Sequence, residues 1–180
     1  LFGNESSIFE MNDSAILDGS AGPTNAILYT FDSNYTLFQR EIFYGDFFTF
    51  VPKQKKFFYI YGTQLHRVDY SVKPAIDNIV YTHPQGDKYF LQPKVAPKNP
   101  EVIYTATQQQ GAYYHFQIFK SEDGGNNWVE YNTQPFGGSL TDLAIDPNNS
   151  DKICVGSRLG EVFFSDNSGL SFKNSFMPIE

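Results

Sequence analysis

Short apolar stretches alternate with polar turns along the whole chain. Residues 113–120, YYHFQIFK, and 128–134, WVEYNTQ, are rich in aromatic and β-branched side chains, and the polar run SEDGGNN separates them. This pattern is typical of two strands joined by a hairpin turn. No stretch of ten or more residues shows a convincing 3.6-residue apolar period. The sequence therefore predicts an all-β chain of short strands, which suits its eighteen Phe and twelve Tyr.

One of the predicted turns has a distinctive arrangement of side chains. Ser121, Asp123, Gly125 and Trp128 stand at offsets 0, 2, 4 and 7 in KSEDGGNNWVEY. Oxygens of Ser and Asp accept local backbone N–H bonds, and Gly adopts positive φ without steric cost. We expect Ser121 and Asp123 to hold the turn, Gly125 to make its left-handed step, and Trp128 to return to the core.

The same arrangement occurs a second time. Ser165, Asn167, Gly169 and Phe172 repeat the offsets, and the two copies begin 44 residues apart. The segments before them also correspond: PKVAPKNPEVIYTAT and TDLAIDPNNSDKICVGS each give an apolar strand, a turn rich in Pro and Asn, and a second strand. A period near 44 residues is typical of four-stranded repeat units.

Two fainter copies lie upstream. Thr30, Asp32, Asn34 and Leu37 keep the offsets with Asn in place of Gly, whereas the turn RVDYS keeps only Asp69. Asn is the residue that next most readily tolerates the left-handed region. The sequence therefore predicts four repeat units, at residues 1–45, 46–88, 89–137 and 138–180.

These motifs resemble the Asp-box (BNR) repeat, S/T-x-D-x-G-x-x-W/F, of sialidases, xyloglucan-active glycosidases and the sortilin/Vps10 sorting receptors. The resemblance is good over residues 97–172 and poor over 24–80. It implies a β-propeller in which each box joins the third and fourth strands of a blade. It also implies that the box residues are structural and lie away from the functional face.

The chain length sets the number of blades. At about 45 residues per blade, 180 residues make about four four-stranded blades. Propellers range from four to eight blades or so. An open stack of blades exposes apolar faces that more chain or a second subunit must cover. We therefore expect part of a larger propeller, or a propeller closed by oligomerisation.

Charge and composition narrow the partners and the compartment. A net charge of −7 argues against a nucleic-acid surface, and the basic run KQKK at 53–56 lies in a predicted turn. No apolar run is long enough to span a membrane. One cysteine, Cys154, excludes an internal disulfide and is expected to be a buried apolar residue. Sequons at Asn4, Asn12, Asn34 and Asn148 favour a secreted or luminal glycoprotein.

Candidate catalytic groups do not form a recognisable site. His66, His83 and His115 show no metal-ligand spacing. A sialidase needs an arginine triad and an F/Y-R-I-P segment, and none of the three arginines lies in such a segment. Asp142 and Asp146 are expected on one face of one strand, as a solvated pair. We expect no catalysis, no metal and no cofactor; the alternative is a portion of a glycan-active hydrolase or a carbohydrate-binding propeller.

The remaining hypothesis is binding. In a blade, the first-to-second and third-to-fourth turns share one rim, so the second-to-third loops form the opposite rim, away from the boxes. The richest of these loops is predicted at residues 108–114, and its candidate contact residues are Gln108, Gln109, Gln110, Tyr113 and Tyr114. Amides and aromatic rings suit polar or glycan-like surfaces. The sequence therefore favours a non-catalytic propeller whose partner is a protein, a further blade, a second subunit or a glycan. The alternative for residues 108–114 is a surface insertion without a binding role.

Overall fold

The computed structural model describes residues 8–12, 15–18, 25–31, 37–84, 88–109, 116–132, 140–157 and 159–175. Within these ranges the chain is built of antiparallel strands, with a single 3-10 turn, η1 (Pro52–Gln54), and no α-helix. The strands form four separate sheets. The prediction of an all-β chain with four propeller-like blades is confirmed.

Each sheet is a meander in which sequential strands pair, and we call the sheets blades 1 to 4. Blade 1 contains β1 (Ile8–Asn12), β2 (Ala15–Asp18), β3 (Asn25–Phe31) and β4 (Leu37–Tyr44). Blade 2 contains β5 (Asp46–Val51), β6 (Lys56–Tyr61), β7 (Gln64–Asp69) and β8 (Ile76–Thr82). Blade 3 contains β9 (Lys88–Phe90), β10 (Lys94–Val95), β11 (Ile103–Gln109), β12 (Phe116–Ser121) and β13 (Val129–Asn132). Blade 4 contains β14 (Leu140–Ile145), β15 (Ile153–Ser157), β16 (Val162–Ser165) and β17 (Lys173–Ser175).

The fifth strand of blade 3 comes from a bulge. Phe90 pairs with Thr107 and Lys94 pairs with Tyr104, so the first strand has one more residue over this stretch than its partner β11. A single extra residue interrupts the ladder and bends the strand locally. β9 and β10 are therefore two halves of one bulged first strand, and blade 3 keeps the four-stranded plan.

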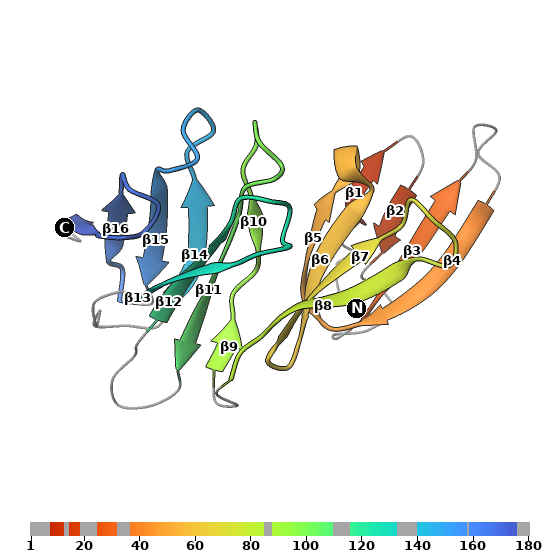
Figure 1. Ribbon diagram of the computed structural model, residues 1–180, viewed down its shortest axis with the longest axis horizontal. Coiled ribbons are helices and arrows are strands. Elements are labelled where there is room, and N and C mark those ends of the chain that lie inside the picture. Colours follow the sequence, from red (N-terminus) through yellow and green to blue (C-terminus); the bar gives the residue numbers. More distant parts are fainter. Residues whose placement is uncertain are drawn as a thin grey trace, which may run out of the picture.

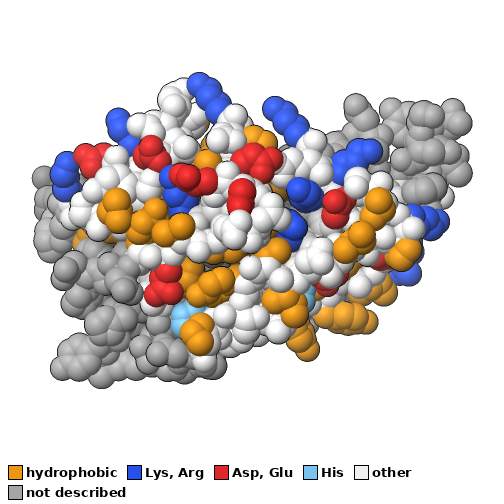
Figure 2. All heavy atoms as spheres, viewed as in Figure 1, with side chains coloured by type: hydrophobic (Ala, Val, Ile, Leu, Met, Phe, Trp, Pro, Cys, Tyr) orange, Lys and Arg blue, Asp and Glu red, His pale blue; other side chains and the backbone are white. Residues whose placement is uncertain are grey.

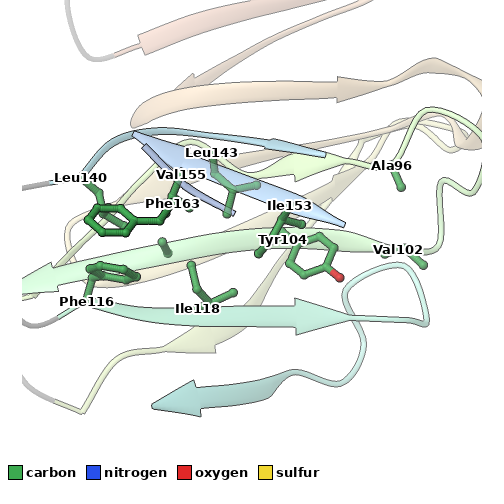
Figure 3. Packing of buried hydrophobic residues seen from close by; sticks show 11 residues of the cluster. Ala96, Val102, Tyr104, Phe116, Ile118, Leu140, Leu143, Ile153, Val155 and Phe163 are labelled. Atoms are coloured by element: carbon green, nitrogen blue, oxygen red, sulfur yellow. The ribbon is translucent and has the colours of Figure 1, made fainter. Parts of the chain in front are cut away.

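The blades stack in chain order, and a hydrophobic cluster joins each neighbouring pair (Figure 1). Phe43 and Leu28 of blade 1 pack with Phe57 of blade 2. Phe58 of blade 2 packs with Phe119 of blade 3 in the second cluster. Figure 3 shows the third cluster, in which side chains from blades 3 and 4 point toward one another; it contains Ala96, Val102, Tyr104, Ala106, Phe116, Ile118, Leu140, Leu143, Ile153, Val155 and Phe163. Face-to-face packing of consecutive sheets is the packing of propeller blades.

The turns fall on two opposite edges of the stack. The first-to-second turns, at η1 and after β10 and β14, all lie at the upper edge in Figure 1. They accept hydrogen bonds from the third-to-fourth turns of the same blades. In blade 3 the amide of Gly124 donates to the carbonyl of Glu101 at 2.9 Å, and in blade 4 the amide of Ser168 donates to the carbonyl of Asp151 at 2.8 Å. We call this edge the box rim. The opposite edge, which carries second-to-third connections such as Tyr61–Gln64, is the loop rim.

Charge also distinguishes the box rim. Figure 2 shows Lys and Arg side chains along the upper edge of the molecule. Lys53 and Lys55 of the KQKK run are exposed there, as expected for a solvated turn. No helix among the described residues has the length and apolar character needed to cross a membrane.

Candidate functional site

The turn that follows β12 is held together by two side chains. The hydroxyl of Ser121 accepts the amide of Gly125 at 2.8 Å and donates to Oδ1 of Asp123 at 2.9 Å. Oδ1 of Asp123 in turn accepts the amides of Asn126 and Asn127 at 3.0 and 2.8 Å. Hydrogen bonds from the backbone and side chain of Asn127 lower the pKa of Asp123 to about 2. Gly125 has a φ of 85°, in the left-handed region.

The turn that follows β16 repeats this network. The hydroxyl of Ser165 accepts the amide of Gly169 at 2.8 Å and donates to Oδ1 of Asn167 at 2.9 Å. Oδ1 of Asn167 accepts the amide of Ser171 at 3.0 Å, and Gly169 has a φ of 91°. An amide oxygen therefore does here what a carboxylate oxygen does at Asp123.

The two upstream copies differ from this pattern. In blade 2, Val68 pairs with Phe57 at the position where Ser121 pairs with Ile103 in blade 3. Asp69 accepts only the amide and hydroxyl of Ser71, at 2.9 and 2.5 Å. In blade 1, Thr30 is buried in β3, whereas Asp32 and Asn34 lie outside the described residues.

Each complete box also contacts the preceding blade. A Cβ at Gly125 would lie 2.8 Å from Cε1 of Phe58 in blade 2, so only glycine allows this approach. Trp128 is half-buried against the cluster between blades 2 and 3, and its indole N–H donates to the carbonyl of Gly125 at 3.2 Å. In blade 4, Phe172 packs edge-on to Phe116 of blade 3, with ring centroids 6.2 Å apart. The boxes therefore join blades as well as strands.

Cations on the third strands of blades 2 and 3 reach in the opposite direction, to the next blade. Arg67 of β7 donates to the carbonyl of Gly124 at 2.9 Å and to Oδ1 of Asn126 at 2.7 Å. Lys120 of β12 contacts Asp151 at 2.9 Å and the hydroxyl of Ser168 at 3.0 Å. Arg67 and Lys120 occupy equivalent positions, since they pair with Phe58 and Tyr104 of the second strands.

The charge of Lys120 is strongly stabilised. Burial alone would lower the pKa of its ammonium group. Hydrogen bonds to Glu122 and Asp151 outweigh burial and raise the pKa above its usual value. The side chain also lies over the Tyr104 ring, 5.7 Å from its centroid. Lys120 therefore connects the box rims of blades 3 and 4.

The corresponding face of blade 4 has no such cover in the described part of the chain. Phe164 pairs with Cys154 as Lys120 pairs with Tyr104, so these positions correspond. In blade 3 the side chains are buried, with Tyr104 at 0 % and Lys120 at 5 % exposure, whereas Phe164 is 49 % exposed. We call the surface formed by Ala144, Cys154, Val162 and Phe164 the uncovered face.

The uncovered face is hollowed. A cavity of about 480 Å³ is lined by Ala144, Cys154 and Phe164 of this face, together with the aliphatic Ile145 and Ile153 and charged groups at its margin. Cys154 is half-buried rather than buried as expected from the sequence, because no further sheet packs on it within the described chain. Partial burial raises the pKa of its thiol.

The sequence-predicted contact loop is only partly described. Gln108 and Gln109 belong to β11, where they pair with Phe116 of β12 and with Lys88 of β9 respectively. They are therefore strand residues at the loop rim rather than loop residues. Gln110, Tyr113 and Tyr114 lie outside the described residues, so their role stays a prediction.

The other titratable candidates have structural contacts. Asp142 lies in β14 and pairs with Lys94 at 2.9 Å. Asp146 follows β14, where its Oδ1 accepts the amides of Asn148 and Asn149 at 2.7 and 3.2 Å. The expectation that both carboxylates lie on one strand is wrong, because Asp146 begins the turn. No group of three or more His, Cys, Asp or Glu side chains within the described ranges is placed to hold a metal ion.

Comparisons with known proteins bear on the fold alone. No family model and no curated protein sequence matches the chain. Among solved structures, it is similar to an ancestral GH74 enzyme, with a TM-score of 0.61 and 17 % identity over 94 % of this chain and 25 % of the other. It is also similar to a putative 6-phosphogluconolactonase from Bacteroides fragilis, with a TM-score of 0.53 and 12 % identity over 91 % of this chain and 55 % of the other. The chain thus spans a quarter of the first protein and about half of the second, and both likenesses support a partial β-propeller.

Proposed function

We propose that this chain is a non-catalytic propeller module that acts by interaction, and that its uncovered face accepts a further propeller blade. A second copy of the chain is the source of this blade that we propose. Blade 3 packs on blade 2, and blade 4 on blade 3, through an apolar cluster, a box and a cation. The partner would present an apolar blade face to the uncovered face, as blade 4 does to blade 3.

One observation carries the proposal. The same repeat position is buried as Lys120 in blade 3 and 49 % exposed as Phe164 in blade 4. A solvent-exposed blade would be expected to carry a charged or polar side chain there. Instead a large aromatic ring lies beside Cys154 and Val162 on a hollowed surface. Contiguous exposed apolar surface marks an interaction site.

The other end of the stack supplies a complementary surface. On blade 1, Ile27 and Tyr29 are half-buried on the face turned away from blade 2, since Leu28 between them packs in the cluster with blade 2. Blade 1 of one copy can therefore lie on blade 4 of the other in the same order as neighbouring blades. Two such contacts would close a ring of two four-bladed chains, which matches the upper end of the usual range of about eight blades.

The test is the oligomeric state of a variant at the uncovered face. Phe164→Asp places a charge in the proposed interface and is expected to convert a concentration-dependent dimer into a monomer, as measured by light scattering after size exclusion. Val129→Asp is the matched control, because Val129 is also an exposed apolar residue (55 %) but lies on β13 of blade 3.

Two results would overturn the proposal. The first is a wild-type chain that stays monomeric at every concentration it tolerates. The second is a dimer that Phe164→Asp leaves intact while Val129→Asp disrupts it. A circular dichroism spectrum equal to that of the wild type shows that the Phe164 variant is folded.

A further inference from the structure

A second hollow lies between blades 1 and 2, far from the uncovered face. It has a volume of about 460 Å³ and is lined by the end of β4 and by β6, β7 and β8 of blade 2. Volumes of about 300 to 1,000 Å³ are typical of small-ligand sites. Its residues lie near the loop rim, since Tyr44 ends β4 and Tyr61 and Gln64 flank the second-to-third turn of blade 2. We call it the rim pocket.

A polar network forms the floor of the rim pocket. The hydroxyl of Tyr59 donates to Oδ2 of Asp77 at 2.5 Å. Nδ1 of His66 lies 3.0 Å from Oδ1 of Asp77 and 3.1 Å from the Tyr59 oxygen. A carboxylate can only accept a hydrogen bond, and the Tyr59 hydrogen points at Asp77, so both oxygens are acceptors for Nδ1. Nδ1 therefore carries a proton. Burial and the hydrogen bond to Asp77 raise the pKa of Tyr59 above its ordinary range, so its hydroxyl stays protonated.

The network leaves hydrogen-bonding capacity facing the hollow. Nε2 of His66 lies 3.3 Å from the side-chain oxygen of Gln64 at the margin of the pocket. The Asp77 side chain is 34 % exposed, and each carboxylate oxygen has a lone pair beyond the one that the network uses. The floor thus offers an imidazole, an amide and a carboxylate within a few ångströms, with donors and acceptors together.

Aromatic rings form the walls. Tyr61 is 59 % and Tyr44 60 % exposed, and both line the hollow. The Tyr61 ring stands edge-on to His66, with centroids 6.5 Å apart and an interplanar angle of 87°. Figure 2 shows hydrophobic side chains along the lower edge of this half of the molecule. An exposed ring beside a hydrogen-bonding floor gives one flat apolar surface and one polar surface.

We propose that the rim pocket binds a neutral saccharide. A pyranose ring has an apolar C–H face, which stacks on a tyrosine ring, and a rim of hydroxyl groups that both donate and accept. Tyr61 would supply the stacking surface, whereas Gln64, His66 and Asp77 would pair with the hydroxyl groups. This combination of one aromatic platform and mixed donors and acceptors matches a polyhydroxylated ligand better than an apolar one.

A cationic ligand fits the rim pocket less well. An ammonium or guanidinium group needs a carboxylate that is not already shared. Both oxygens of Asp77 already accept hydrogen bonds from Tyr59 and His66. Among the described residues, no other Asp or Glu lines the pocket. A cation would therefore have to share the charge of this one carboxylate with Tyr59 and His66.

Saturation-transfer NMR and calorimetry with neutral oligosaccharides test the proposal. The probes are linear glucose, mannose and galactose hexasaccharides, and a trimethyllysine peptide represents the cationic alternative. At least one oligosaccharide is expected to bind, and Tyr61→Ala is expected to weaken it tenfold or more by removing the stacking surface. Tyr61→Phe keeps the ring and should bind as the wild type does. Asp77→Asn should weaken binding, because the amide replaces an acceptor with a donor.

Phe164→Ala is the matched control, since it removes another exposed aromatic ring that is not part of the pocket. It should leave saccharide binding unchanged even where it alters association between copies. The proposal fails if none of the oligosaccharides binds, if Tyr61→Ala binds them as tightly as the wild type, or if only the trimethyllysine peptide binds. None of these outcomes depends on whether a second copy covers blade 4.

Discussion

The two complete turns show that the oxygen, not the charge, holds the box. Oδ1 accepts backbone amides in both turns, from Asn126 and Asn127 in one and from Ser171 in the other, although the first residue is Asp123 and the second is Asn167. The side-chain N–H of Asn167 also finds a partner, the hydroxyl of Ser171, at 2.9 Å. The two turns therefore place an acid, Asp123, and an amide, Asn167, at the same position of the motif.

Asp123→Ala is expected to lower the free energy of unfolding by about 1 to 3 kcal/mol, because turn amides lose their acceptor. Asp123→Asn should lose clearly less, since its oxygen can still accept the amides of Asn126 and Asn127. Chemical denaturation of both variants against the wild type measures the difference. Equal losses for Ala and Asn would show that the charge matters more than the oxygen.

The pH dependence of the same variants gives a second measurement. The pKa of Asp123 is lowered to about 2 in the folded chain, from an ordinary value of 3.8. A lowered folded pKa stabilises the fold fully above the ordinary value, and this contribution is lost as the pH falls toward the folded value. The stability advantage of the wild type over Asp123→Asn should therefore shrink between about pH 4 and pH 2.

Residues that act within one turn could be predicted from the sequence, whereas residues that act between blades could not. Ser121 and Asp123 lie two positions apart and bond locally, so their offsets predict their contacts. Arg67 and Lys120 have no local motif, because their partners lie 57 and 31 residues away along the chain, at Gly124 and Asp151. Their equivalence becomes visible only once the pairing register of each blade is known.

At the scale of elements, each blade is joined to its neighbours by different groups on its two faces. Toward the preceding blade, blades 3 and 4 present the box, where a Cβ at Gly125 would lie 2.8 Å from Phe58 and a Cβ at Gly169 would lie 3.2 Å from Ile118. Toward the following blade, blades 2 and 3 present a cation from the third strand, Arg67 and Lys120 respectively. Because the two faces of a blade differ, the stack has a direction, and its two ends present different faces. Blade 4 ends the stack with the uncovered face.

Lys120→Met tests the cationic contact while it keeps most of the apolar stem. We expect a loss of about 1.5 to 3 kcal/mol in the free energy of unfolding, the range for hydrogen bonds to charged groups, because Asp151 and Ser168 lose their shared donor. Lys98→Met is the control, since Lys98 is exposed on the same rim and, within the described residues, donates a single exposed hydrogen bond, to Asn148 at 2.6 Å. Chemical denaturation compares the two, and equal effects would show that Lys120 does not join the blades.

The strands were predicted from alternation and the turns from Pro, Asn and Gly, and both rest on short-range sequence signals. Irregularities were not predicted. The bulge between Phe90 and Lys94 contacts blade 2, where the hydroxyl of Thr49 donates to the carbonyl of Pro93 at 2.6 Å, and no local sequence signal marks that contact. The rim pocket could not be predicted either, because Tyr59, His66 and Asp77 come from three strands whose pairing brings them together.

At the scale of the whole molecule, the chain behaves as a one-dimensional stack in which each blade depends on its neighbours. Blades 2 and 3 are covered on both faces by hydrophobic clusters, whereas blade 4 is covered on one. In such stacks, stability is close to a sum of unit and interface contributions. Local opening should therefore be easiest where an interface is missing.

Hydrogen exchange in the monomeric chain is expected to reveal this difference. Amides of β15 and β16 should exchange at least tenfold faster than those of β11 and β12, which corresponds to about 1.4 kcal/mol of local stability. Peptide-resolved mass spectrometry on Phe164→Asp, the variant expected to be monomeric, measures the rates without a partner. If a further blade covers blade 4 in the wild type, protection of β15 and β16 should rise toward that of blade 3 with increasing protein concentration. Uniform protection across the monomer would contradict the stack, because it would show that all four blades open together and that a missing interface costs blade 4 nothing.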